Sequence, residues 1–164
     1  TRAVPWGILL LFGGGLALSK CFEVSVLSAW IGGQFEALAE APPSGLVASV
    51  NVIVAAHTEL TSNTATASMS LPIMASLARA IETHPLLLMI PATLAASCAF
   101  VLPVSTPPNS IVYGSGRVPI TKMIKAGLIM EVVALVLITA LVFTLGSLVF
   151  GVAGPFPEWA VAGS

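Results

Sequence analysis

Apolar residues occur along the chain in long blocks that are interrupted at polar positions. The longest block covers 126–150, where Glu131 is the only charged residue. A helix needs about 20 apolar residues to cross a bilayer, so this block predicts a complete transmembrane span. Three basic residues precede it: Arg117, Lys122 and Lys125. Because loops rich in Lys and Arg stay in the cytoplasm, we expect the C-terminus to lie outside.

Two further blocks predict interrupted helices. Blocks 46–56 and 65–80 are each too short to cross comfortably, and the polar run 57–64 separates them. This pattern predicts a re-entrant helical hairpin with a polar tip. Block 86–102 stops at the proline-rich run 103–109. Proline removes a backbone donor and ends a helix, so we expect a broken helix there.

The N-terminal residues predict one glycine-rich apolar helix over 6–18 and an amphipathic helix over 23–38 that lies along the membrane interface. The chain opens without a methionine or the residue order of a signal peptide, so we expect a piece of a longer polypeptide. Three parts follow: 1–40 with these two helices, 41–118 with the hairpin and the broken helix, and 119–164 with the last span and an external tail.

The composition indicates that lipid is the solvent. Charged residues make up 8% of the chain and hydrophobic residues 57%, whereas a soluble domain carries about 25% charged residues. The net charge of −1 gives no indication of a nucleic-acid partner. Cys21 and Cys98 lie in separate apolar segments, and we expect two buried free thiols rather than a disulfide.

The polar clusters at the two interruptions are the candidate site, because polar backbone survives at membrane depth only when it is buried in protein or lines a wet cavity. The last carbonyls of a helix have no partner and can coordinate a cation. Thr58 and Thr61 are expected in the last turn of the incoming half-helix, and the Ser105 carbonyl is expected to be available. Oxygen ligands without carboxylates suit Na⁺ better than Ca²⁺.

The N-termini of the next half-helices favour an anion, because their N–H groups and positive dipole ends point at it. Ser62, Asn63 and Thr64 are all good N-caps for a helix that begins at Ala65. In the second interruption Thr106 is expected to cap a helix. Its neighbour Pro107 then occupies the first helical position.

Three motifs, in this order, resemble the divalent anion:sodium symporter family, which includes citrate, dicarboxylate and sulfate cotransporters. The first is the apolar run 5–15, and the second is the Ser62-Asn63-Thr64 run, which is followed by Leu71-Pro72-Ile73. The third is the stretch 99–112, which reads AFVLPVSTPPNSIV. The resemblance covers roughly residues 4 to 159.

The resemblance implies an all-α polytopic membrane protein that forms the second half of an inverted-repeat, elevator-type transporter. Family members work as homodimers, and the first repeat is missing from this chain. Carried over by position, one Na⁺ would be held by Thr58, Thr61, Asn63 and Ser105. The substrate carboxylate would face Ser62, Asn63, Thr64, Thr106 and Pro107. The family often has alanine in place of Ser105, a change that a carbonyl ligand tolerates.

The implied function is sodium-coupled symport of di- or tricarboxylates such as succinate across the plasma or inner membrane, with Na⁺ as coupling ion and no cofactor. A sodium-independent dicarboxylate exchanger of the same fold and a non-transporting accessory subunit are the alternatives. An enzyme is not expected, because the sequence lacks a G-x-S-x-G motif and is expected to lack paired intramembrane acids. His57 and Glu59 are expected to be structural residues at the mouth of the hairpin. The sequence leaves open which anion is carried and how many Na⁺ accompany it.

Overall fold

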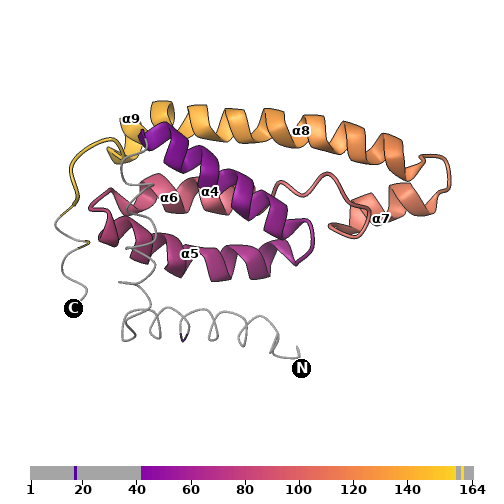
Figure 1. Cartoon of the computed structure of the whole chain (residues 1–164), viewed down its shortest axis with the longest axis horizontal. Helices are drawn as coiled ribbons and strands as arrows, with labels where there is room; N and C mark the ends of the chain where they lie inside the picture. The colour runs from indigo at the N-terminus through magenta and orange to yellow at the C-terminus, as the bar shows by residue number, and fades with distance from the viewer. Residues whose placement is uncertain (1–16, 18–41, 158–159, 161–164) are drawn as a thin grey trace, which may run out of the picture.

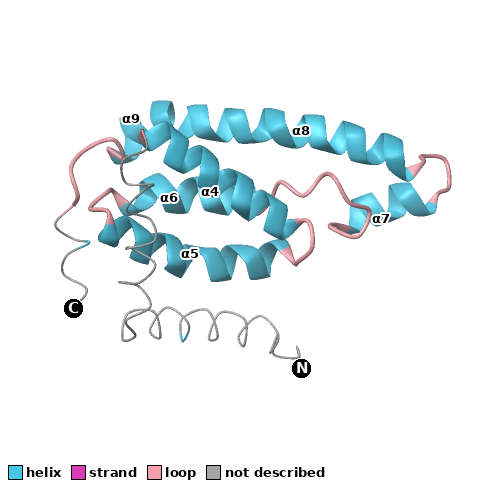
Figure 2. Ribbon diagram, viewed as in Figure 1, coloured by secondary structure: helices cyan, strands magenta, loops and turns pink. Residues whose placement is uncertain are grey.

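The computed structural model describes residues 17, 42–157 and 160. The regular elements of the described residues are all helical (Figure 2). They are α4 Pro43–Thr58, α5 Asn63–Ala80, α6 Pro85–Ala95, α7 Pro107–Gly114, α8 Ile120–Leu141, the π-helical turn η1 Val142–Gly146 and α9 Ser147–Phe150. The expected helices over 6–18 and 23–38, and Cys21, lie outside the described residues. Cys98 is a free thiol.

Helices α4 and α5 form a hairpin whose two arms run in opposite directions (Figure 1). The turn between them covers only 59–62, which is shorter than the predicted polar run 57–64. Helix α4 includes His57 and Thr58 in its last turn. Thr61 lies after the helix and not in its last turn, where the sequence predicts it. At the other side of the turn α5 begins at Asn63, two residues before the predicted start.

Helix α6 returns beside the hairpin and ends earlier than the sequence predicts. It begins at Pro85, where the Nδ1 atom of His84 accepts a hydrogen bond of 3.2 Å from the N–H of Leu86. The apolar block predicted a helix to residue 102, but α6 ends at Ala95 and the chain is irregular over 96–106. The prediction was wrong. The N–H groups of 96–98 still bond to carbonyls of α6, but those of Val101 and Leu102 bond to a distant carboxylate, so the helix does not continue to residue 102.

The hydrophobic core lies where α4, α5 and α6 pack together, with the far end of α8 against them. Its largest fully buried apolar side chains are Val47 from α4, Leu77 from α5, Leu88 from α6, and Val142 and Val152 from the end of the chain. These residues fix the three helices at the end of the hairpin that is remote from its turn. The turn itself is therefore presented at the opposite end of the packed helices (Figure 1).

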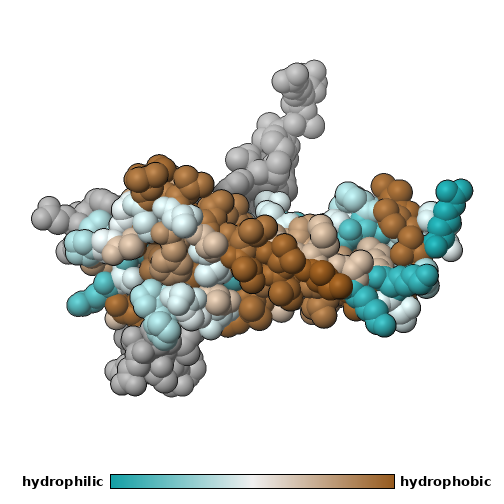
Figure 3. All heavy atoms as spheres, turned by 90° about the horizontal axis from the view of Figure 1, so that it is seen from above, coloured by the Kyte–Doolittle hydropathy of each residue, from teal (hydrophilic) through white to brown (hydrophobic). Residues whose placement is uncertain are grey.

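Helix α8 and its continuation form the longest apolar helical stretch of the described residues. The helical stretch Ile120–Phe150 has 31 residues and is long and apolar enough to cross a membrane. Its start lies six residues before the predicted span, so Lys122 and Lys125 lie in its first turns rather than in a loop. Hydrophobic surface dominates one face of the molecule, and hydrophilic atoms gather at one end of it (Figure 3).

Candidate functional site

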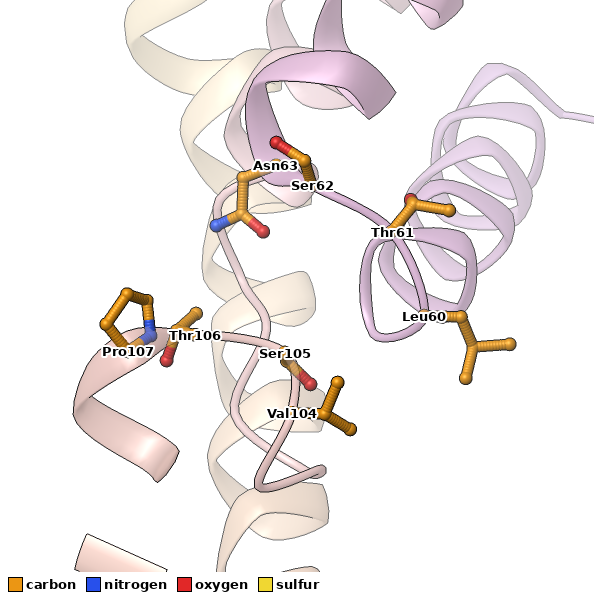
Figure 4. A pocket seen from close by; sticks show the side chains of 8 residues that line it. All are labelled: Leu60, Thr61, Ser62, Asn63, Val104, Ser105, Thr106 and Pro107. Carbon is orange, nitrogen blue, oxygen red and sulfur yellow. The ribbon is translucent and has the colours of Figure 1, made fainter. Parts of the chain in front are cut away.

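The hairpin turn and the start of α7 face each other across an open cavity of about 440 Å³. Ser62 and Asn63 at the start of α5 lie on one side, with Thr106 and Pro107 at the start of α7 on the other (Figure 4). The complete lining is Leu60, Thr61, Ser62, Asn63, Val104, Ser105, Thr106 and Pro107. The structure thus brings together six of the predicted site residues, from two interruptions that are about 40 residues apart in the sequence. Of the other two, Thr58 is buried and Thr64 is exposed on α5, and neither lines the cavity.

Thr58 ties the turn to the end of α6. Its side chain is fully buried, and its hydroxyl donates to the carbonyl of Ala96 at 2.8 Å. The same oxygen lies 2.9 Å from Oδ1 of Asn63. A hydroxyl carries one hydrogen and two lone pairs. That hydrogen serves either the Ala96 carbonyl or Oδ1 of Asn63 at one time. The Thr58 and Asn63 oxygens stand side by side with further lone pairs, which is an arrangement that a small cation stabilises.

Thr61 belongs to a second group of hydroxyls behind the turn. Its hydroxyl donates to the carbonyl of His57 at 2.9 Å and lies 2.6 Å from Oγ1 of Thr66. Because Thr61 uses its hydrogen on His57, Thr66 donates to Thr61. Thr66 is 1% exposed and orients Thr61, a role that sequence reasoning missed. Its sequence signal was weak, because Thr66 is one of several hydroxyl residues in the first half of α5.

The start of α5 keeps its donors available. Ser62 occupies the N-cap position with an extended backbone, yet its side chain forms no capping hydrogen bond. The N–H groups of the first turn of a helix have no partner within the helix. The start of α5 therefore presents backbone N–H groups and the positive end of the helix dipole at the cavity, with Ser62 in its lining.

The start of α7 is different, because its donors are either removed or already used. Thr106 caps the helix, and its Oγ1 accepts from the N–H of Asn109 at 3.4 Å. The first two positions are Pro107 and Pro108, which have no N–H. The Thr106 hydroxyl still has its hydrogen to donate. Toward an anion, α7 thus offers one hydroxyl and its dipole.

Glu59 is a residue of this region that sequence reasoning placed at the mouth of the hairpin, but the structure places it in the turn. It is 6% exposed. Its two carboxylate oxygens accept from the N–H groups of Val101 and Leu102, each at 2.8 Å, and Ser105 also donates its hydroxyl to the carboxylate. The sequence signal for this role was the acid itself, because Glu59 is the one acidic residue in the polar run 57–64.

Glu131 from α8 lies beside Glu59, within hydrogen-bonding reach of its carboxyl group. It is 8% exposed, and its Oε2 atom has no hydrogen-bond partner among the described residues. That these two acids lie side by side was not anticipated from the sequence. The two acids are 72 positions apart, and only packing of the turn against α8 brings them together.

Comparison with known proteins finds relatives that match most of this chain. A family profile described as the sodium:sulfate symporter transmembrane region matches residues 1–152. The sodium-dependent dicarboxylate transporter SdcS of Staphylococcus saprophyticus is 47% identical over 92% of this chain. The human Na(+)/dicarboxylate cotransporter 3 is 46% identical over 97% of it, and the rat Na(+)/citrate cotransporter is 48% identical over 96% of it.

The chain spans only part of these relatives, namely 29% of the length of the bacterial protein, 26% of the human one and 27% of the rat one. The relatives are membrane transporters rather than enzymes. The family profile covers most of the chain, including every residue that lines the cavity. The chain is therefore a transmembrane part of a member of the sodium:sulfate symporter family.

Proposed function

We propose that this chain forms one ion-and-anion site of a secondary active transporter that couples Na⁺ to the uptake of di- or tricarboxylates. The observation that carries the proposal is the meeting of two interrupted helices at one cavity. One interruption contributes closely spaced oxygen atoms, and both contribute the N-terminus of a helix. Broken helices at the middle of the membrane are how many secondary transporters build their sites.

Sodium is assigned to the oxygen cluster of the turn. Thr58 and Asn63 supply the two adjacent oxygens, and Thr61 supplies a hydroxyl fixed by its bond to His57. Ser105 lies in the facing wall of the cavity, where its carbonyl can complete the site. No carboxylate is required as a direct ligand, which favours a monovalent ion over Ca²⁺.

The anion is assigned to the space between the two helix starts. At α5 the N–H groups and the hydroxyl of Ser62 donate to one carboxylate, and Thr64 and Asn63 lie in the same first turn. At α7 Thr106 donates its hydroxyl, while Pro107 shapes the wall. Bound Na⁺ adds a positive charge to two dipole ends, so a dianion is bound well only when the cation site is filled. That dependence is the basis of coupling.

The depth of the turn supports a re-entrant hairpin. At 1.5 Å per residue the helical stretch from Ile120 to Phe150 is about 46 Å long, and Glu131 stands about 16 Å along it. Glu59 in the turn lies against Glu131. The turn is therefore level with the interior of the spanning helix, well past the lysines at its start. A polar turn at that depth requires a wet cavity or a protein environment.

The remaining parts of the proposal concern the complete protein. The rest of the polypeptide would supply the first repeat, with its own hairpin and sodium site, and two copies would form a homodimer in the plasma membrane. The basic residues at the start of α8 favour a cytoplasmic position for that end, which would put the C-terminus outside. Transport would move the hairpin and the broken helix together across the membrane in an elevator-type shift.

The decisive experiment is the Asn63→Ala variant of the full-length protein, reconstituted in liposomes with an inward Na⁺ gradient. Removing Oδ1 takes one oxygen from the sodium site, and we expect succinate uptake to fall by about tenfold or more. Ser68→Ala is the matched control, because the Ser68 hydroxyl only bonds to Thr64 one turn back on α5. Normal uptake by correctly inserted Asn63→Ala protein contradicts the proposed site.

Replacement of Na⁺ by choline separates symport from sodium-independent exchange. The oxygen cluster of the turn predicts that uptake stops in choline. Unchanged uptake in liposomes preloaded with unlabelled succinate would instead identify an exchanger of the same fold. Binding without any uptake would identify an accessory subunit.

A further inference from the structure

Glu59 holds the irregular segment 96–106 through both its side chain and its backbone. The carboxylate accepts two consecutive N–H groups, from Val101 and Leu102, and a hydroxyl from Ser105. The Ser105 hydroxyl also lies 3.0 Å from the backbone oxygen of Glu59. One residue of the hairpin turn is thus bonded to three residues of the other interruption.

The irregular segment needs such an acceptor. The N–H groups of 96–98 still bond to carbonyls of α6, but those of Val101 and Leu102 lie beyond the reach of that helix. A buried N–H without a partner destabilises the fold. A carboxylate accepts several N–H groups at once, and these charge-assisted bonds are stronger than bonds to a neutral acceptor. Glu59 therefore replaces the missing helical turn as the partner of this backbone.

Helix α8 closes the other side of the same segment. A Cβ atom built on Gly127 would lie 2.2 Å from the backbone oxygen of Phe100 and 2.7 Å from the Cα of Val101. The two backbones are therefore in direct contact, which only glycine permits. The segment is enclosed between Glu59 on one side and Gly127 on the other, so it cannot move away from the hairpin turn without breaking one of these contacts.

We propose that Glu59 is a positioning residue that fastens the 96–106 segment to the hairpin turn and so fixes Ser105 opposite Asn63. This inference rests on the proposed function, in which Ser105 and Asn63 bind Na⁺ from two sides of one site. Its consequence is that the two interruptions behave as one rigid unit. Sodium then binds to a site that is already assembled and does not have to order two independent loops.

Conservative substitutions of Glu59 separate this role from a general structural one. Gln has the same length but only one acceptor oxygen, and its NH₂ group faces an N–H donor where a second acceptor is needed. Asp keeps both acceptors and the charge on a shorter stem. We therefore expect Glu59→Gln to release one of the two N–H groups and Glu59→Asp to keep a weakened form of the contact.

The functional test is the Na⁺ dependence of succinate uptake by the full-length protein. We expect Glu59→Gln to raise the half-saturating Na⁺ concentration about tenfold, with the maximal rate at saturating Na⁺ changed by less than about threefold. Glu59→Asp should lie between this variant and the unmodified protein. Glu82→Gln is the control, because Glu82 is an exposed acid in the α5–α6 turn at the other end of the hairpin.

A second measurement reports the fastening directly. Leu60 and Val104 are exposed and line the same cavity from opposite interruptions (Figure 4). With cysteines at both positions in a background without other cysteines, a short bifunctional thiol reagent should cross-link them readily. The Glu59→Gln change should slow that reaction severalfold, and Na⁺ should restore it.

The outcomes distinguish this inference from the proposed function. If Glu59→Gln changes neither the half-saturating Na⁺ concentration nor the cross-linking rate while Asn63→Ala abolishes uptake, the fastening role is wrong and the sodium site stands. If Asn63→Ala is also fully active, the sodium site itself is wrong. If Glu59→Gln does not insert, the cross-linking rate of Glu59→Asp decides: a rate equal to that of the unmodified residue overturns the proposal, and a slower rate supports it.

Discussion

The two interruptions of the described helices differ in how their backbone hydrogen-bonding groups are satisfied. The hairpin turn is four residues long and leaves the start of α5 without a side-chain cap. The segment between α6 and α7 covers 96–106, and Glu59 accepts from the N–H groups of its Val101 and Leu102. Asn109 alone donates to the carbonyls of Ala99 and Leu102, each at 3.1 Å. One interruption is open to a ligand, and much of the other is bonded to side chains of the protein.

This difference assigns different tasks to the two sides of the cavity. Uncommitted donors and oxygens are the groups that a ligand can use, so most of the recognition falls to the hairpin turn. The side with Thr106 and Pro107 contributes shape, one hydroxyl and a dipole. The variants below test this division, and they are ordered from the largest expected effect to the smallest.

We expect the largest loss of stability from a substitution at Gly127, which packs against the 96–106 segment. In Gly127→Ala the new methyl group meets backbone atoms of Phe100 and Val101, which cannot move as a side chain would. We expect a loss of about 3 kcal/mol of stability, at the upper end for overpacking, measured by thermal unfolding in detergent. Gly114→Ala is the matched control, because nothing lies within 4 Å of its Cβ position. Equal melting of the two variants contradicts the close contact.

The link between the two sides is tested at Thr58. Thr58→Val keeps the shape of the side chain but leaves the Ala96 carbonyl without its donor and removes one oxygen from the sodium site. We expect a loss of about 2 kcal/mol of stability and a tenfold weaker response to Na⁺. Thr93→Val is the control and should change neither stability nor the Na⁺ response. The Thr93 side chain is exposed, and its hydroxyl bonds to the Met89 carbonyl one turn back on α6. A normal Na⁺ response of Thr58→Val would restrict Thr58 to a structural role.

The two helix caps are compared directly by Thr106→Ala and Ser62→Ala. Thr106 forms a capping bond and Ser62 does not. We expect Thr106→Ala to destabilise the protein by about 1 kcal/mol and Ser62→Ala by less than about 0.5 kcal/mol. Both should weaken succinate binding, because both residues line the cavity. Equal losses of stability, measured by thermal unfolding, would show that the difference between the caps has no energetic meaning.

The smallest effect is expected at the remote end of the hairpin, where His84 caps α6. Burial lowers the pKa of His84 below its usual value of 6.5, because the charged form is poorly solvated. Below about pH 6.5 the unfolded chain binds a proton that the folded chain does not, so stability falls as the pH decreases. Melting temperatures between about pH 7.5 and pH 5.5 should show this decline. His84→Asn keeps an acceptor for Leu86 and should flatten it; an unchanged slope would exclude His84 as its origin.

Local sequence signals predicted the features that depend on neighbouring residues. The start of α7 followed from Thr106 and Pro107, and the hairpin turn followed from polar residues between two apolar blocks. The early end of α6 could not be predicted, since 96–102 is apolar enough to continue a helix. Its backbone is captured by Glu59, more than 40 positions earlier in the chain. The contact of Gly127 with Phe100 and the approach of Glu131 to Glu59 are likewise products of packing.

The exposed flank of α8 has a practical consequence for handling the protein. Val132, Val136 and Leu137 are each more than half exposed, and Leu148 is 83% exposed. Exposing such apolar surface to water costs about 25 cal/mol per square ångström. During extraction from the membrane, hydrocarbon must therefore cover this flank. A water-soluble redesign would substitute this flank with charged side chains. It would have to leave the opposite face of α8, with Gly127, unaltered.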